Sequence, residues 1–248
     1  MCFDILNSIL RNVQTSFKFY LTAAESPVQC GRPEITTDEE YNNSCFLYSH
    51  TYNNMITGGS AFDNGANFLY SDMSVGRNTY ERNILFGTEE GGALKNNCGK
   101  LNMGINNIVH RTGSMEYAYG GCRKGDRENP MSLENFHNIY LFDNMDGFSF
   151  ARPIDRYFDE TPDFHDNLYW SLVDGDKEQE KFPDNRNWDD WQSTGNDTGS
   201  LWQDPLFEDP SAGRYILAAN SPAWDLGIEQ IDLDNIGIQV QGKYHGTN

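Results

Sequence analysis

The 248-residue chain has no run of 18 apolar residues, so we expect no helix that spans a membrane. Basic residues are also few, with 18 Lys and Arg against 37 Asp and Glu, which gives a net charge of −19. Nucleic acid is therefore not an expected partner, because binding it requires a basic face that neutralises phosphates. A neutral or cationic ligand suits this surface better, whereas an anionic polysaccharide would need a local basic cluster or Ca²⁺ to offset the field.

Cysteine is scarce and irregularly spaced. None of the five cysteines forms a CxxC pair, so the sequence does not support a zinc ribbon, and the odd number allows at most two disulfides. The N-terminus lacks the unbroken apolar stretch of a secretion signal, and the repeat described below begins abruptly, which favours an N-terminally truncated member of a longer protein. Two glycosylation sequons, at residues 42–44 and 196–198, favour an extracellular or cell-surface location.

The most informative feature of the chain is a repeat. Five times an asparagine stands just before a short apolar pair, with steps of 29, 24, 31 and 29 residues between successive asparagines. These are Asn54, Asn83, Asn107, Asn138 and Asn167. Such a period is typical of one turn of a solenoid and predicts the coils of a parallel β-helix. Each asparagine is expected to adopt a positive φ or to bond its own backbone, and its amide to pair with the asparagine one coil away.

The repeat predicts an all-β chain in three parts. Residues 1–45 would be an N-terminal cap or remnant coil with a loop, residues 46–173 the coils of the β-helix, and residues 174–248 an irregular C-terminal extension packed along the solenoid. A short helix is expected at residues 187–192. We expect the large apolar side chains of the extension to be at least partly buried, namely Leu206, Phe207, Ile216, Leu217 and Trp224.

Several stretches resemble one group of proteins. The sequences DPLFEDP at 204–210 and SPAWDLG at 221–227 resemble the "ADPLFVDP…SPA.D.G" ending of right-handed parallel β-helix proteins of the carbohydrate-active type. Upstream, LYSDMS at 69–74 and GGALKNNCGK at 91–100 resemble two coils of the same group. The resemblance covers about residues 46–236 and implies a right-handed β-helix. It also implies an association with carbohydrate, as a glycoside hydrolase, polysaccharide lyase or epimerase.

A solenoid places equivalent residues of adjacent coils about 5 Å apart. Glycosidases need two carboxylates roughly 5–5.5 Å apart for retention of configuration or roughly 6.5–9.5 Å for inversion. Counting forward from the coil asparagines predicts a column of Asp72, Lys95 and Glu116, with Glu90 in a nearby turn. We therefore predict Asp72, Glu116 and Glu90 as catalytic residues, with Lys95 tuning the pKa of the carboxylates. The alternative for this column is a solvated ladder at a coil corner.

A second set of residues is predicted to line a sugar groove, because aromatic faces stack on sugar rings and Arg pairs with uronate carboxylates. The set comprises Lys95, His110, Tyr117, Tyr119 and Arg123. In a lyase, Lys95 or Arg123 would be the base and Tyr119 or His110 the acid. His110 also fits a structural histidine at a strand end.

The leading functional hypothesis is a glycoside hydrolase that acts on a polysaccharide through a carboxylate pair. A polysaccharide lyase or epimerase is the alternative among enzymes, and a non-catalytic glycan-binding or structural surface solenoid is the alternative from another class. The expected partner is a polysaccharide or oligosaccharide, and the protein is expected to be a monomer. No metal ligands and no cofactor are predicted, apart from Ca²⁺ for an anionic glycan.

Overall fold

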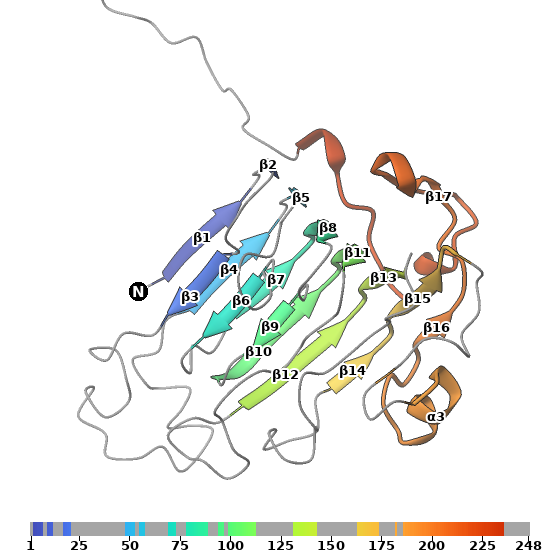
Figure 1. Cartoon of the computed structure of the whole chain (residues 1–248), viewed down its shortest axis with the longest axis horizontal. Coiled ribbons are helices and arrows are strands. Elements are labelled where there is room, and N and C mark those ends of the chain that lie inside the picture. Colours follow the sequence, from blue (N-terminus) through green and yellow to red (C-terminus); the bar gives the residue numbers. More distant parts are fainter. Residues whose placement is uncertain are drawn as a thin grey trace, which may run out of the picture.

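A computed structural model shows that the described part of the chain is built mainly from short parallel strands stacked side by side (Figure 1). The structure describes residues 2–6, 9–11, 17–20, 48–52, 55–57, 69–72, 78–88, 94–96, 99–112, 131–142, 163–173, 182 and 186–235. Within these residues, no helix is long and apolar enough to cross a membrane. The prediction of a strand-rich chain with parallel pairing is confirmed.

Three parallel sheets arise because successive coils place equivalent strands next to one another. The six-stranded sheet has the order β1 (Cys2–Leu6), β4 (Tyr48–Tyr52), β7 (Asn78–Glu81), β10 (Gly99–Ile105), β12 (Met131–Phe136), β14 (Asp163–His165). The seven-stranded sheet has the order β16 (Leu201–Trp202), β15 (Leu168–Ser171), β13 (Ile139–Phe142), β11 (Ile108–Thr112), β8 (Ile84–Thr88), β5 (Met55–Thr57), β2 (Ile9–Arg11). The third sheet contains β3 (Phe17–Tyr20), β6 (Leu69–Asp72) and β9 (Leu94–Asn96). This arrangement is consistent with a β-helix-like solenoid.

The same two-residue corner joins the six-stranded sheet to the seven-stranded sheet in four successive coils. The second corner residue is a repeat asparagine, and it is buried in each of these coils. The first has a positive φ, of 51° at Arg82, 53° at Asn106, 55° at His137 and 51° at Asp166. The positive φ expected as one option for the asparagine is therefore found on the residue before it. Asn54 lies outside the described residues.

The predicted pairing of asparagines between coils is confirmed. Asn83 Nδ2 donates to Asn107 Oδ1 at 3.1 Å, and Asn107 Nδ2 donates to Asn138 Oδ1 at 2.9 Å. Asn138 Nδ2 in turn donates to Asn167 Oδ1 at 3.1 Å. The backbone N–H of each donor asparagine bonds the same oxygen as its side chain. This buried ladder fixes how successive coils align, because a one-residue slip would break every bond in it.

The ladder ends on a buried carboxylate, Asp197. Its Oδ1 accepts hydrogen bonds from Asn167 Nδ2 at 3.2 Å, Tyr169 Oη at 3.0 Å and Ser200 Oγ at 2.8 Å. Its Oδ2 accepts from Trp191 Nε1 at 2.5 Å. Burial raises the pKa of Asp197 above its ordinary value, although these four donors act to lower it. Asp197 thus accepts a hydrogen bond from Asn167, the last asparagine of the ladder, and connects the ladder to the segment that follows the coils.

That segment contains the predicted short helix, α3 (Trp188–Ser193). Asn187 caps it by accepting a hydrogen bond from the backbone N of Asp190 at 2.8 Å. After the helix the chain returns to the stack, where Leu201 of β16 pairs with Leu168 of β15. In this last corner Ser200 takes the place of the asparagine and Gly199, with a φ of 79°, that of the positive-φ residue.

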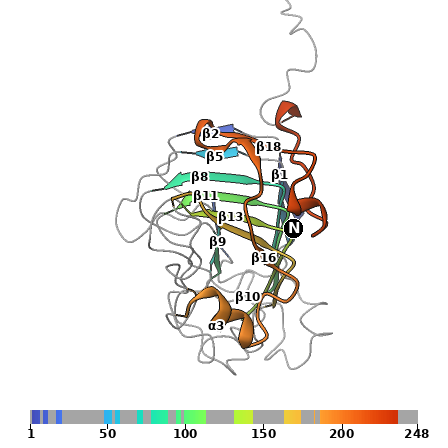
Figure 2. The same cartoon turned by 90° about the vertical axis from the view of Figure 1, so that its right-hand side faces the viewer.

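The C-terminal extension covers one face of the seven-stranded sheet. It contains the antiparallel pair β17 (Phe207–Asp209) and β18 (Arg214–Leu217). Its buried side chains form one core cluster with those of β8, β11, β13 and β15, and they include Tyr215, Leu217, Ile228 and Ile231. Figure 2 shows this segment, in orange to red, running alongside the stacked strands.

Burial in the extension follows the expectation only in part. Leu217 is buried, and Leu206 and Phe207 are half-buried. Ile216 and Trp224 remain 47% and 40% exposed, so the expectation was wrong for these two residues. Alternate residues of β18 point to opposite sides, and Tyr215 and Leu217 take the side that faces the sheet.

Candidate functional site

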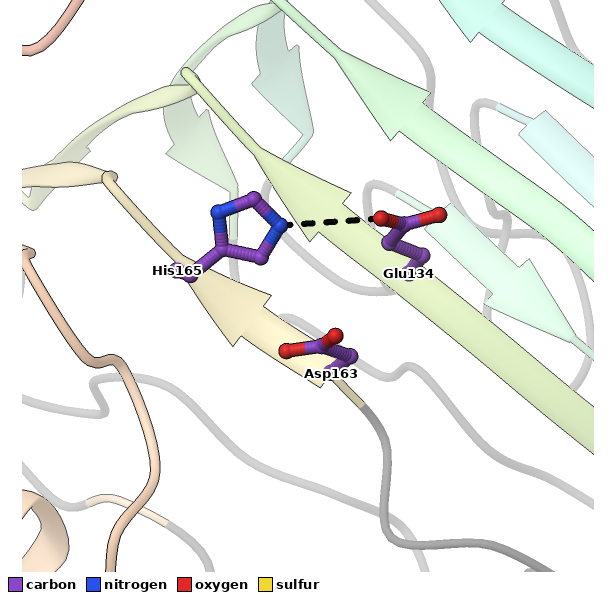
Figure 3. A group of neighbouring side chains, drawn as sticks. All are labelled: Glu134, Asp163 and His165. Carbon is purple, nitrogen blue, oxygen red and sulfur yellow. Dashed lines mark ion pairs between the residues drawn. The ribbon is translucent and has the colours of Figure 1, made fainter.

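Three side chains capable of chemistry meet on the outer face of the six-stranded sheet. Burial alternates along β12, where Asn135 is buried and Glu134 is half-buried. It also alternates along β14, where Phe164 is buried between the exposed Asp163 and the half-buried His165. Because successive side chains of a strand point to opposite faces, Glu134, Asp163 and His165 share the outer face (Figure 3).

The strand register brings these side chains together. Glu134 and Asp163 are directly paired residues on β12 and β14. One carboxylate oxygen of each and one imidazole nitrogen of His165 all lie within 4.8 Å of one another. The closest ion pair among them joins His165 Nε2 to Glu134 Oε1 at 3.6 Å, with side chains 28% and 42% exposed. The group is therefore reachable from solvent.

The His165 ring is held in place by its neighbours. Its Nδ1–H donates to Asp166 Oδ2 at 2.9 Å. The ring also stacks on Phe136, with centroids 4.9 Å apart and planes 7° from parallel. Burial lowers the pKa of the imidazole, but the hydrogen bond to Asp166 and the two facing carboxylates raise it by more. The pKa of His165 thus lies above its ordinary value.

Asp166 reaches His165 from the positive-φ corner position. The equivalent residue of the next coil is Gly199, and a Cβ built there would overlap Asp166 Oδ1. Glycine is thus needed at position 199 both for its φ of 79° and for the space that the Asp166 carboxylate occupies. Asp166, a corner residue outside the cluster, therefore helps to orient the His165 ring inside it.

The predicted catalytic column falls mostly where the structure does not describe side chains. Asp72 ends β6 opposite Tyr20, and Lys95 in β9 lies opposite Tyr70, two positions before Asp72. Five of the predicted site residues lie outside the described residues, namely Glu90, Glu116, Tyr117, Tyr119 and Arg123. These assignments stay predictions.

His110 is not a groove residue, and that prediction was wrong. Its side chain is fully buried, and its Nδ1 lies 2.7 Å from Tyr215 Oη in the C-terminal extension. Its ring also packs against Phe86 at a centroid distance of 5.1 Å. The extension covers the sheet face on which His110 lies, so this histidine joins the two parts of the core. The structural interpretation of His110 is the one observed.

Sequence reasoning missed Glu134, Asp163 and His165, although a signal was present. Glu134 stands four residues before Asn138, and Asp163 stands four residues before Asn167. Equal offsets from the coil asparagine place two residues on the same column of adjacent coils. Counting backward from the asparagines, through the strand, would have found the pair.

No protein-family model, no curated protein and no solved structure matches this chain. The cluster is therefore interpreted from its geometry. Two carboxylates and an imidazole on an open face can transfer protons, attack an electrophilic carbon or bind a divalent cation.

Proposed function

We propose that the protein is a right-handed parallel β-helix of the carbohydrate-active type and that it acts as a glycoside hydrolase. The observation that carries the proposal is the adjacent carboxylate pair Glu134 and Asp163, with oxygens within 4.8 Å on an accessible sheet face. Retaining glycosidases use carboxyl groups about 5–5.5 Å apart, whereas inverting enzymes need roughly 6.5–9.5 Å to admit a water. An upper bound of 4.8 Å between one oxygen of each carboxylate is shorter than the spacing that admits the water of an inverting enzyme, so the mechanism that we propose is the retaining one.

The contacts of Glu134 and Asp163 suggest which carboxylate is the nucleophile and which is the acid. Glu134 Oε1 lies 3.6 Å from His165 Nε2, a contact that holds its carboxylate in place, so we assign Glu134 as the nucleophile that attacks the anomeric carbon. Asp163, the residue directly paired with Glu134 in the strand register, is the other carboxyl of the pair and protonates the leaving oxygen. It then takes a proton from the water that releases the sugar from Glu134.

Two further observations support the wider assignment. The described strands form stacked parallel sheets, as the resemblance to carbohydrate-active β-helix proteins implies. The net charge of −19 favours a neutral or cationic glycan over an anionic one. An extracellular or cell-surface location belongs to the same proposal, because most polysaccharides lie outside the cell.

The test is reducing-sugar release from a panel of neutral, amino-sugar and acidic polysaccharides. On the glycan that is cleaved, Glu134→Gln and Asp163→Asn should each lower turnover by about 100-fold or more. Asp225→Asn, which removes an exposed carboxylate in the extension, should leave turnover unchanged. Azide should restore turnover to Glu134→Ala, because a small anion can attack in place of the missing carboxylate. Wild-type rates in the first two variants would overturn the assignment of the pair.

The same panel separates the alternatives. A polysaccharide lyase would release unsaturated products from acidic glycans, and an epimerase would change the sugar configuration without release. Binding without any chemical change would move the assignment to a non-catalytic glycan-binding solenoid. The predicted role of Ca²⁺ would then be tested by repeating the binding measurement with a chelator.

A further inference from the structure

We propose that Glu134, Asp163 and His165 form a binding site for a divalent transition-metal cation of the Zn²⁺ type. The site would use one oxygen of each carboxylate and Nε2 of the imidazole, and it would leave the solvent side open for water. Metal binding is independent of whether the protein cleaves glycans.

The donor set selects the class of cation. Imidazole nitrogen suits Zn²⁺ and related transition metals, whereas Ca²⁺ and Mg²⁺ are bound mainly by oxygen ligands. Three protein ligands with an open fourth position are the arrangement that zinc adopts in sites accessible to water. The cluster of Glu134, Asp163 and His165 offers this set on two adjacent strands.

The distances are short enough for a shared ion. Zinc–nitrogen and zinc–oxygen bonds of about 2.0–2.2 Å imply donor atoms about 3.4 Å apart in a tetrahedral site. His165 Nε2 and Glu134 Oε1 are already 3.6 Å apart. The other distances between donor atoms are at most 4.8 Å, and they can shorten through small movements of side chains at the solvent surface. Paired positions on parallel strands keep the two acids facing one ion.

The contacts of the His165 ring hold it in the orientation that a metal ligand needs. The Nδ1–H of His165 donates to Asp166, and the other ring nitrogen, Nε2, lies 3.6 Å from Glu134 Oε1. A histidine that binds a metal commonly donates its other N–H to such a carboxylate, which fixes its tautomer and orientation. Phe136 restrains the ring plane by stacking, and Gly199 leaves the room that Asp166 needs. The proposed ligand, His165, and the carboxylate that orients it, Asp166, are thus consecutive residues at the end of β14.

Metal binding has a consequence that rests on the proposed function. A carboxylate that ligates a cation cannot attack a sugar or transfer a proton to it. Zn²⁺ at this position would therefore inhibit hydrolysis, with glycan and cation competing for Glu134 and Asp163.

The experiment is a titration of the full chain with Co²⁺, followed by displacement with Zn²⁺. Wild type should bind one Co²⁺ per chain with the absorption of nitrogen and oxygen ligands and no thiolate charge-transfer band, which separates this site from the cysteines. His165→Ala and Glu134→Gln should weaken binding by about 100-fold or more, and Asp166→Asn by about 10-fold. Asp225→Asn, which lowers the net negative charge equally, should bind as wild type does.

Absence of binding, purely thiolate-type spectra, or tighter binding of Ca²⁺ than of Zn²⁺ would each overturn the proposal. So would wild-type affinity in His165→Ala and Asp166→Asn, with circular dichroism used to show that both variants are folded. If Zn²⁺ binds but does not slow an observed hydrolysis, the shared use of the carboxylates is wrong. If no glycan is cleaved, the hydrolase proposal fails while the titration still decides the metal site.

Discussion

Replacing Asn138 by alanine should be among the most destabilising single changes in the chain. Its Oδ1 accepts from the backbone N and the Nδ2 of Asn107, both at 2.9 Å. Its Nδ2 donates to Gly104 O at 2.9 Å, Phe136 O at 3.0 Å and Asn167 Oδ1 at 3.1 Å. The alanine variant removes all five contacts at a position with no solvent exposure. Water cannot replace them without opening the stack between coils.

The magnitude follows from these contacts. A net hydrogen bond contributes about 0.5–1.5 kcal/mol, and a buried polar group left without a partner costs about 1–3 kcal/mol. Five lost contacts therefore predict that Asn138→Ala lowers the free energy of unfolding by about 3–6 kcal/mol. Whole domains are stabilised by only about 5–15 kcal/mol, so the variant should be close to unfolding. Asn138→Asp should be comparably severe, because a carboxylate cannot donate to the carbonyls of Gly104 and Phe136.

The assay is denaturant unfolding followed by circular dichroism. Asn220→Ala is the matched control, since it deletes the same amide from an exposed turn and should change stability by at most about 0.5 kcal/mol. If Asn138→Ala lay within about 1 kcal/mol of wild type with an unchanged m-value, the ladder would not hold the coils together as argued.

Three further predictions concern the ladder end, the site corner and the extension. Asp197 has a raised pKa in the folded state, so the folded protein binds more protons than the unfolded chain between the two pKa values. Its contribution is present below the unfolded pKa of about 3.9 and is lost as pH rises through the folded pKa. The stability of wild type relative to Asp197→Asn should therefore fall with rising pH in denaturation series, and a rise would contradict this. Gly199→Ala should lower the melting temperature more than Gly195→Ala does. Of these two variants, only Gly199→Ala should weaken Co²⁺ binding. Both glycines have a positive φ, but a Cβ at Gly195 meets open space, so equal effects would argue against the Asp166 contact. Tyr215→Phe should cost about 1 kcal/mol in thermal unfolding through loss of the bond to His110, and an unchanged melting temperature would count against that bond.

The sequence alone determined the repeat and its consequences. The hydrogen bonds of each asparagine depend only on the backbone of its own corner and on the asparagine of the next coil. The parallel pairing and the ladder could therefore be predicted from Asn83, Asn107, Asn138 and Asn167 without knowing the loops between them. The helix at 188–193 was likewise predictable, because Asn187 and the two acids that follow it form a local cap.

The site depended on tertiary structure. Counting forward from an asparagine crosses a corner and a loop whose length differs from coil to coil, so the register of a residue beyond the loop cannot be read from the sequence. Lys95 pairs with Tyr70 rather than with Asp72, and Glu116 lies outside the described residues. Glu134 and Asp163 lie on the strand immediately before their asparagines, where register is regular and loop length has no effect. The C-terminal extension decided which face of the seven-stranded sheet is covered. Packing between residues more than 100 positions apart buried His110 beneath Tyr215, and no local pattern in either segment encodes that contact.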